Sequence, residues 1–349
     1  MKRDSFVDEI DAALGDAALR YRRERYAFEQ RQRMDAASRR FDAGAWAQMA
    51  EMGWLSVASD EADGGLGRRI GSIALLARHA GAAGINEPLL STWIAAEVLR
   101  AHGSGAQRAR WLEPLMAGGL RVACAFGADA RAADGVLTGR CEAVPDADIA
   151  DLLLLQVQGR WHAVRAGAAG LQREACPLLD GRGAATLQLQ ACAAEALPVQ
   201  APDTPAQLAG LAAAADALGA MELAFELTLG YVKTREQFGA PIGQHQVVMH
   251  RTVDMYLRLM ESQAVLAQAV EALASGEPAR AAEVHAAKAF IPPQGRLLAQ
   301  EAVQLHGGIG ITEEYAVSHC LRRVLVDEQL FGRSAEHLQR FAQPLSETR

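Results

Sequence analysis

Hydrophobic residues recur at helical spacing at both ends of this 349-residue chain, but not in its middle. From residue 4 to about residue 118, apolar side chains lie three and four positions apart, as in Trp46, Met49 and Ala50, which is typical of packed helices. From Val122 to about Leu197 the apolar runs are short and bounded by Gly, Pro and Asp, which predicts strands. We therefore expect an α+β multidomain protein, with a helical domain over residues 1–120, a small β domain over 121–200 and a helical domain over 201–349.

The C-terminal domain is predicted to be a four-helix bundle. One face of a long helix is traced by Val248, Thr252, Met255, Leu259, Ser262, Leu266, Ala269 and Leu273. Gly276 is expected to end this helix and Pro278 to begin the next one. Pro292 and Pro293 lie inside a later helical pattern and are expected to kink or split it. Helices this apolar must pack together, and an extra apolar face favours oligomerisation.

Composition excludes several kinds of partner. The net charge is −7 with both signs interspersed, which argues against nucleic acid and membrane surfaces and favours small molecules or proteins. The five cysteines show no metal-ligand spacing, and their odd number favours a reducing compartment. We see no secretion signal at the N-terminus and no apolar run near the roughly 20 residues of a membrane span. The sequence thus predicts a soluble, cytoplasmic protein without a metal site.

A polar, turn-forming segment, YVKTREQFGAPIGQHQ, interrupts the alanine- and leucine-rich helices at residues 231–246. An arginine fork suits a pyrophosphate, an aromatic ring can stack on an adenine, and glycines let backbone N–H groups approach phosphate oxygens. Arg235 and Phe238 in this segment, and Gly307 and Gly308 further on, supply those parts. They indicate a flavin nucleotide site. Alternatively, Arg235 and Phe238 only cap and staple a helix junction, and the paired glycines are a helix C-cap.

Three segments resemble motifs of the acyl-CoA dehydrogenase family. Residues 231–246 follow the pattern Y-x-x-x-R-x-x-F-G-x-x-I-x-x-x-Q, and QLHGGIGITEEY at 304–315 is similar to Q-x-x-G-G-x-G. WAQMAEMGWLSVASDEADGGLG, at 46–67, resembles an N-terminal pattern of the family. The resemblance covers nearly the whole chain and is loosest in the middle domain. It implies the acyl-CoA dehydrogenase fold and FAD-dependent α,β-dehydrogenation of an acyl-CoA thioester.

The resemblance also implies which residues bind the cofactor. FAD bound mainly by one subunit would be contacted by Arg235, Gln237, Phe238 and Gln246, whereas Gln304, Gly307 and Gly308 would reach the FAD of a neighbouring subunit. Ser334, which matches the threonine of the family's Y-E-G-T turn, is assigned to the cofactor as well. This sharing implies at least a dimer, either of identical chains or with a related dehydrogenase subunit. Electron-transfer flavoprotein or a similar acceptor is the implied redox partner.

The family's catalytic base is absent from both positions where the resemblance places it. Removal of the proton alpha to the thioester carbonyl needs a carboxylate beside the substrate. In most members this is the glutamate of Y-E-G-T, which aligns with Gly332 in LFGRSAEH. In other members it lies on the helix before R-x-x-F-G, at the position of Ala209. The nearby carboxylates that remain as substitutes are Glu328, Asp327 and Glu222.

The middle domain departs from the family too, because the flavin-contacting T-E-P-x-x-G-S-D segment is missing and residues 143–145 replace W/F-I-T. Three hypotheses stay open. The chain is a subunit of a heteromeric dehydrogenase whose partner carries the base, an active homo-oligomer with a displaced base, or a binding scaffold without enzymatic activity. The sequence favours the first. It does not indicate the acyl group.

Overall fold

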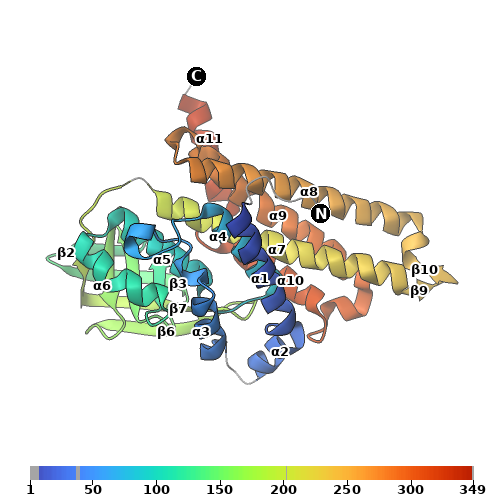
Figure 1. Cartoon of the computed structure of the whole chain (residues 1–349), viewed down its shortest axis with the longest axis horizontal. Helices are drawn as coiled ribbons and strands as arrows, with labels where there is room; N and C mark the ends of the chain where they lie inside the picture. The colour runs from blue at the N-terminus through green and yellow to red at the C-terminus, as the bar shows by residue number, and fades with distance from the viewer. Residues whose placement is uncertain (1–7, 37–39, 202, 348–349) are drawn as a thin grey trace. The chain divides into compact units, whose positions relative to one another are not determined.

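The computed structural model describes residues 8–36, 40–201 and 203–347. The chain divides into two compact units. The first unit is Met1–Gln32, Ala74–Ile85 and Gly210–Arg349, and the second is Arg33–Ile73 and Asn86–Ala209. Helices build both ends of the chain, and the two larger sheets are confined to its middle, drawn in green in Figure 1. The domain boundaries at residues 120 and 200 stay a prediction.

The second unit contains the predicted β region. Its helices are α3 (Ala43–Glu51), α5 (Leu89–His102) and α6 (Gly105–Met116), and its strands are β1 (Val122–Ala125), β2 (Asp129–Ala133), β3 (Val136–Pro145), β4 (Leu152–Val157), β5 (Arg160–Arg165), β6 (Leu171–Pro177), β7 (Gly183–Ala193) and β8 (Glu195–Ala196). Two four-stranded sheets have the orders β1-β4-β5-β8 and β2-β3-β7-β6. All neighbours are antiparallel except β1 and β4. Both sheets contribute to one core that includes Leu137, Leu153, Val164 and Leu187.

The first unit contains the C-terminal bundle. Its helices are α1 (Glu9–Glu24), the start of α2 (Phe28–Ala36), most of α4 (Ile70–Ala83) and of α7 (Thr204–Thr234), α8 (Gln246–Ser275), α9 (Ala281–His306), α10 (Ala316–Gln329) and α11 (Ser334–Glu347). α9 packs against α8, α10 and α11. The long C-terminal helices predicted from the apolar spacing are confirmed.

The predicted register of α8 is confirmed where the helix is buried. Of the eight residues expected on its inner face, six are buried: Met255, Leu259, Ser262, Leu266, Ala269 and Leu273. The helix ends at Ser275, and Gly276 follows it in the left-handed conformation with φ +68°, a conformation that glycine adopts readily. Pro278 begins the next helical turn. Local chemistry alone therefore set this boundary.

The expectation that no apolar run reaches membrane-spanning length is wrong. α7 has 31 residues and contains an 18-residue window apolar enough for a span, the one such helix found among the described residues. In that window 83% of the residues are buried inside the protein. The run is long because alanines and leucines face packed neighbours on every side of the helix. One such helix is weak evidence for a membrane span, since the core helix of a soluble protein passes the same test.

Pro292 and Pro293 were expected to kink or split their helix. They do not split it, because α9 is continuous from Ala281 to His306, and the kink stays a prediction. Pro292 lacks the N–H that would normally donate to the carbonyl of Lys288, four residues earlier. The Ser334 hydroxyl, at the start of α11, donates to that carbonyl over 3.3 Å. A side chain from another helix thus satisfies an acceptor that the proline leaves free.

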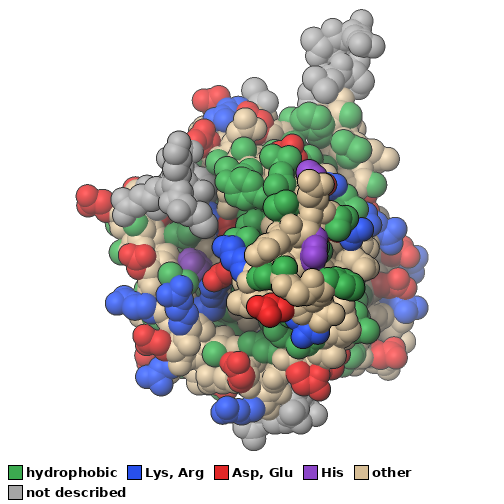
Figure 2. Space-filling view, turned by 90° about the vertical axis from the view of Figure 1, so that its right-hand side faces the viewer, with side chains coloured by type: hydrophobic (Ala, Val, Ile, Leu, Met, Phe, Trp, Pro, Cys, Tyr) green, Lys and Arg blue, Asp and Glu red, His purple; other side chains and the backbone are tan. Residues whose placement is uncertain are grey.

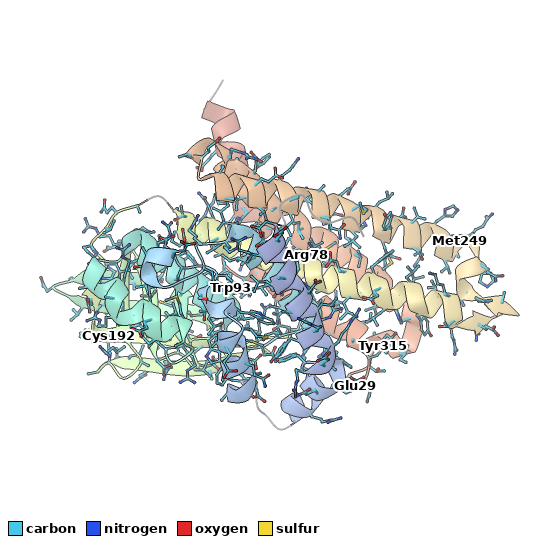
Figure 3. All side chains as sticks on the ribbon, in the orientation of Figure 1. Glu29, Arg78, Trp93, Cys192, Met249 and Tyr315 are labelled. Carbon is cyan, nitrogen blue, oxygen red and sulfur yellow. The ribbon has the colours of Figure 1, made fainter. Side chains whose placement is uncertain are left out.

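The helices α4 and α7 touch through their backbones. A Cβ on Gly81 would lie 1.9 Å from the carbonyl oxygen of Asp216, and one on Gly219 would lie 1.8 Å from that of Arg78. Arg78, labelled in Figure 3, also places its Nη2 2.5 Å from Oε1 of Glu222 on α7. Any side chain at either glycine would meet rigid backbone, so the crossing requires both glycines.

Gly219→Ala is expected to separate α4 from α7 and destabilise the protein. Overpacking a core costs about 1–3 kcal/mol, and more where backbone is the obstacle, so we expect a loss above about 3 kcal/mol in the free energy of unfolding. Gly230→Ala is the matched control on the same helix, because a Cβ on Gly230 would meet no atom within 4 Å. It should stabilise by roughly 0.5–1 kcal/mol through helix propensity. Urea unfolding followed by circular dichroism measures both, and equal stability of the two variants would contradict the close crossing.

Candidate functional site

The turn between α7 and α8 carries the first predicted motif. The short strands β9 (Glu236–Gln237) and β10 (Ala240–Pro241) pair antiparallel, and Phe238 and Gly239 between them have φ +56° and +82°. Two left-handed residues make a type I′ turn, which strains a bulky residue such as phenylalanine. Phe238 is 94% exposed, and its ring approaches that of His245 edge-on, with centroids 6.1 Å apart. A ring this exposed is not a staple within the helix junction.

The polar residues of this hairpin lie on the surface. Arg235 and Gln237 are exposed, and Gln246, also exposed, is the first residue of α8. Within the described part of the chain, no hydrogen bond or ion pair engages the Arg235 guanidinium, while Gln237 Nε2 donates to the neighbouring carbonyl of Glu236 over 2.8 Å. The hairpin therefore presents a free guanidinium and an exposed aromatic ring on one short segment.

The second predicted motif forms a tight loop after α9. The 3₁₀ turn η5 (Gly307–Ile311) follows the helix directly. A Cβ on Gly310 would lie 2.8 Å from the carbonyl oxygen of Val303, so only glycine lets the loop double back over the last helical turn. Gly307 and Gly308 are exposed and have no atom within 4 Å of a Cβ position, and Gln304 is exposed beside them. The loop offers open space against its backbone, as close approach of an oxyanion requires.

The structure brings the two motifs together within one chain. Tyr231, the first residue of the first motif, stacks on His306 of the second, with ring centroids 4.4 Å apart and an interplanar angle of 28°. The ring of Tyr315, the last residue of the second motif, also lies near that of His306, with centroids 5.1 Å apart. All three residues lie within the two sequence motifs, but the sequence gave His306 no role, because stacking between segments 75 positions apart leaves no local signal.

The first predicted base position, Gly332, is closed. Its φ is +102°, and a Cβ there would lie 2.9 Å from Nε2 of His337. The second, Ala209, is buried on α7. A Cβ on the following residue, Gly210, would lie 2.8 Å from Cε1 of the same imidazole. His337 therefore fills the space beside Gly332 and Gly210, a role that the sequence did not reveal.

The imidazole of His337 is fully engaged. It is 1% exposed, its Nε2 lies 3.2 Å from the carbonyl oxygen of Phe331, and its Nδ1 lies 3.1 Å from Nδ1 of His285. A carbonyl only accepts, so Nε2 carries the proton and Nδ1 accepts the N–H of His285. Burial lowers the pKa of both imidazoles to about 4. His337 is thus neutral and has no lone pair available for a proton from a substrate.

The three substitute carboxylates are also constrained. Glu222 Oε1 accepts from Arg78 Nη2 at 2.5 Å and from Gln263 Nε2 at 2.8 Å. Glu328 Oε2 lies 3.3 Å from Arg296 Nε. Asp327 is completely buried.

Lys288 caps the C-terminal end of α10. Its Nζ donates to the carbonyl oxygens of Asp327 and Glu328 over 2.7 and 3.2 Å, and burial lowers its pKa to about 8. The hydroxyl of Ser334, a residue assigned to the cofactor by the sequence, donates a hydrogen bond to the Lys288 carbonyl. This region is a packed polar cluster that satisfies helix ends.

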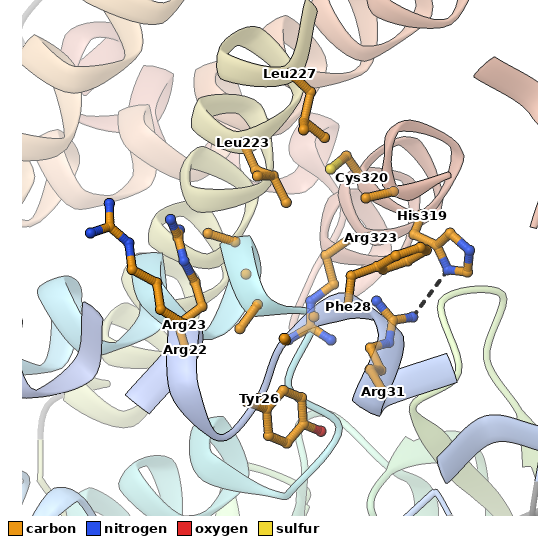
Figure 4. A pocket seen from close by; sticks show the side chains of 16 residues that line it. Arg22, Arg23, Tyr26, Phe28, Arg31, Leu223, Leu227, His319, Cys320 and Arg323 are labelled. Carbon is orange, nitrogen blue, oxygen red and sulfur yellow. Dashed lines mark hydrogen bonds between the residues drawn. The ribbon is translucent and has the colours of Figure 1, made fainter. Parts of the chain in front are cut away.

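A cavity of about 230 Å³ lies elsewhere in the first unit (Figure 4). Side chains from α1, α2, α4, α7 and α10 line it, and Arg22, Arg31 and Arg323 are among them. Arg31 Nη2 lies 3.3 Å from Nδ1 of His319, and Arg323 forms a bidentate pair with Asp216. None of the predicted site residues lines this cavity. Five separate helices form its walls, so no single sequence motif could have predicted it.

Comparisons with known proteins identify the class of this fold and site. The family model of the acyl-CoA dehydrogenase N-terminal domain matches residues 10–119, and that of the C-terminal domain matches residues 207–345. The acyl-CoA dehydrogenase IpdE2 of Mycobacterium tuberculosis is 30% identical over 309 residues, covering 87% of both chains. The chain therefore belongs to the acyl-CoA dehydrogenase family of oxidoreductases, and the predicted fold and enzyme class are confirmed.

Solved structures agree with this assignment. A variant of the Tcur3481-Tcur3483 steroid ACAD superposes with a TM-score of 0.90 at 27% identity, covering 97% of this chain and 98% of that one. The ChsE4-ChsE5 complex from Mycobacterium tuberculosis also gives a TM-score of 0.90, at 24% identity and 99% and 100% coverage. Another protein of the same fold, PigA, is solved with FAD and proline, with a TM-score of 0.87 at 20% identity and 99% coverage of both chains. Relatives of this fold thus bind FAD.

The His285–His337 pair predicts a loss of stability at acid pH. Both folded pKa values are lowered from 6.5 to about 4, so the unfolded chain binds more protons between these values. The free energy of unfolding should therefore fall as the pH drops from about 6.5 to about 4, by roughly 1–3 kcal/mol for the pair, a figure discounted because His285 is half-buried.

Urea unfolding across this pH range measures how much of the pH dependence of stability comes from the His285–His337 pair. The double variant His285→Leu with His337→Leu should show a flatter pH dependence than the parent protein, whatever its absolute stability. His250→Gln, which alters an exposed histidine on α8, should leave the dependence unchanged. Parallel curves for the parent and the double variant would rule out the pair as the source.

Proposed function

We propose that this chain is a subunit of an FAD-dependent acyl-CoA dehydrogenase, and that a partner of the same fold carries the catalytic base. One observation carries the proposal. The position that aligns with the family's glutamate is a left-handed glycine, Gly332, and His337 closes the space into which a side chain would extend. The nucleotide-facing motifs, in contrast, are open. The chain is suited to hold part of a cofactor and unsuited to remove the substrate proton.

The residues of both motifs fit the nucleotide part of FAD. The Arg235 guanidinium offers paired donors to a pyrophosphate, and the exposed ring of Phe238 offers a surface for stacking. Gly307 and Gly308 leave room for phosphate oxygens against the backbone. The amides of Gln237, Gln246 and Gln304 supply further donors and acceptors at the same end of the bundle, whereas Ser334 remains a proposed contact with its hydroxyl already engaged. FAD, when bound, accepts the hydride from the β carbon of the acyl group.

An exposed apolar stripe on α8 supports a partner chain. Its residues, each 44–63% exposed, are Val247, Met249, Val253, Tyr256, Leu257 and Met260. Met249 is labelled at the start of α8 in Figure 3, and Figure 2 shows hydrophobic side chains gathered on the face at which α8 begins. Large apolar patches of this kind mark protein interfaces. Two relatives are named as pairs of different chains, Tcur3481-Tcur3483 and ChsE4-ChsE5, which favours a heteromeric partner for this chain.

An active homo-oligomer with a displaced base is the second candidate. It needs a free carboxylate beside the substrate, and Glu222 and Glu328 are each held by an arginine. The acyl-CoA substrate and an electron-transfer flavoprotein-like acceptor apply to both candidates.

The purified chain alone should dehydrogenate acyl-CoA thioesters very slowly. Loss of a positioned general base costs about 10²–10⁴ in rate, and co-expression with a related partner subunit should restore turnover and yield a hetero-oligomer on size-exclusion chromatography. The assay is acyl-CoA-dependent reduction of an electron acceptor with short, long and ring-bearing thioesters. Turnover by the chain alone at ordinary enzyme rates, about 1–10³ per second, would overturn the partner requirement.

Gly332→Glu is not expected to supply the missing base. A glutamate there must adopt a left-handed backbone and displace His337, whose Nε2 lies 2.9 Å from the new Cβ. Gly332→Ala is the matched control, because it introduces the same strain without a carboxylate. Both variants should lose stability relative to the parent in thermal unfolding, and neither should gain activity.

Arg235→Ala tests the proposed contact between the Arg235 guanidinium and the pyrophosphate of FAD. Removing a charge-assisted contact to a pyrophosphate costs about 1.5–3 kcal/mol, so FAD affinity should fall roughly tenfold to a hundredfold. Isothermal titration with FAD, on the protein with any partner that it requires, measures the change. Lys233→Ala removes an exposed positive charge two residues earlier and should have little effect. Equal FAD affinity of the parent and Arg235→Ala would show that the motif is structural here.

A further inference from the structure

His306 is the last residue of α9 and lies between two tyrosines from different segments. Its ring stacks on Tyr231 of α7 with centroids 4.4 Å apart, and the ring of Tyr315, the residue before α10, lies 5.1 Å away. The histidine is 3% exposed. Its surroundings are therefore aromatic, although it sits at the junction of two loops that are themselves exposed.

One hydrogen bond fixes the orientation of this ring. His306 Nδ1 donates to the carbonyl oxygen of Ala302 over 2.8 Å, so Nε2 is the unprotonated nitrogen. In the described part of the chain Nε2 has no hydrogen-bond partner. Burial lowers the pKa of His306, which keeps the ring neutral. The ring is thus anchored to its own helix and held against both tyrosines by aromatic contacts.

Besides its hydrogen bond to Ala302, His306 contacts both segments that carry a motif. The N–H of Arg235 donates to the carbonyl of Tyr231 over 2.8 Å, so the tyrosine lies one helical turn before the arginine. On the other side, a Cβ on Gly310 would lie 2.9 Å from Cβ of His306, so the glycine loop packs directly on this residue. Displacement of the His306 ring would therefore move the arginine turn and the glycine loop together.

We propose that His306 is a positioning residue that couples the segments 231–246 and 304–315 and thereby sets their joint geometry for FAD. The proposal rests on the proposed function for the FAD part, but the coupling itself is a property of the chain. Tyr231 and Tyr315 contact the His306 ring from the two segments, and the ring joins them. A purely structural histidine would stabilise the last turn of α9 without linking the two segments.

Two substitutions separate stacking from hydrogen bonding. His306→Phe keeps an aromatic ring between the tyrosines and loses the bond to Ala302, whereas His306→Ala loses both. His102→Ala is the matched control, because His102 is also buried, its Nδ1 also lies 3.0 Å from a backbone carbonyl oxygen, that of Val199, and its ring approaches that of Trp161, with centroids 6.2 Å apart. It is the last residue of α5, outside both segments.

Hydrogen–deuterium exchange of the full chain without added FAD measures the coupling. His306→Ala should raise exchange in 231–246 and in 304–315 together, His306→Phe should leave both close to the parent, and His102→Ala should alter neither. Faster exchange in 304–315 alone would overturn the coupling. So would identical exchange in His306→Phe and His306→Ala. If His306→Ala does not fold, His306→Gln, which is polar but cannot stack, replaces it.

FAD titration then tests the functional part. Affinity should fall about tenfold or more in His306→Ala and stay within about threefold of the parent in His306→Phe. Unchanged affinity in His306→Ala, with a parent that binds FAD, would overturn the positioning role. A parent protein that binds no FAD with or without its partner would instead overturn the proposed function, while the exchange result would still decide the coupling.

Discussion

The backbone contact between α4 and α7 is the constraint on which the first unit depends. Gly81 and Gly219 let the two helices approach until a single methyl group would clash with a carbonyl oxygen. This contact fixes the position of Asp216. Its carboxylate accepts hydrogen bonds from Nε and Nη2 of Arg323 on α10, over 2.6 and 2.8 Å. A buried ion pair is favourable only when its geometry is fixed, because both charges have lost their water. The crossing supplies that fixed geometry, and it thereby orients α10 relative to α7.

Two left-handed turns in the bundle have opposite surroundings. At the hairpin, Phe238 is strained and almost fully exposed, and the guanidinium of Arg235 is free nearby. At the turn before α11, Phe331 is also left-handed, but His337 packs against the adjacent Gly332 and donates to the Phe331 carbonyl. Strained backbone persists only where its surroundings determine it. We infer that the first turn is kept for a ligand or a second chain, whereas the second serves the packing of the bundle itself.

Much of the fold followed from the sequence because the signals were local. The inner face of α8 repeats at helical spacing, and Gly276 adopts the left-handed conformation that ends the helix. The segment 231–246 was predicted to form turns, and the structure has a type I′ hairpin at 238–239. The continuity of α9 could not be foreseen, because the acceptor that Pro292 leaves free is satisfied by Ser334 from another helix. Likewise, only the structure shows that the long apolar run of α7 is mostly buried inside the protein.

The sequence by itself determined the family, the order of helical and β regions, and the residues proposed to hold a nucleotide, since each of these lies in one continuous segment. It also placed glycine and alanine, at 332 and 209, where the resemblance puts the family's base. Only the tertiary structure decided what occupies that space, because His337 and His285 are 52 residues apart and meet through the packing of α9 and α11. The same holds for the stack of Tyr231 on His306. Contacts between distant segments depend on the whole set of helix crossings, and no stretch of sequence encodes them alone.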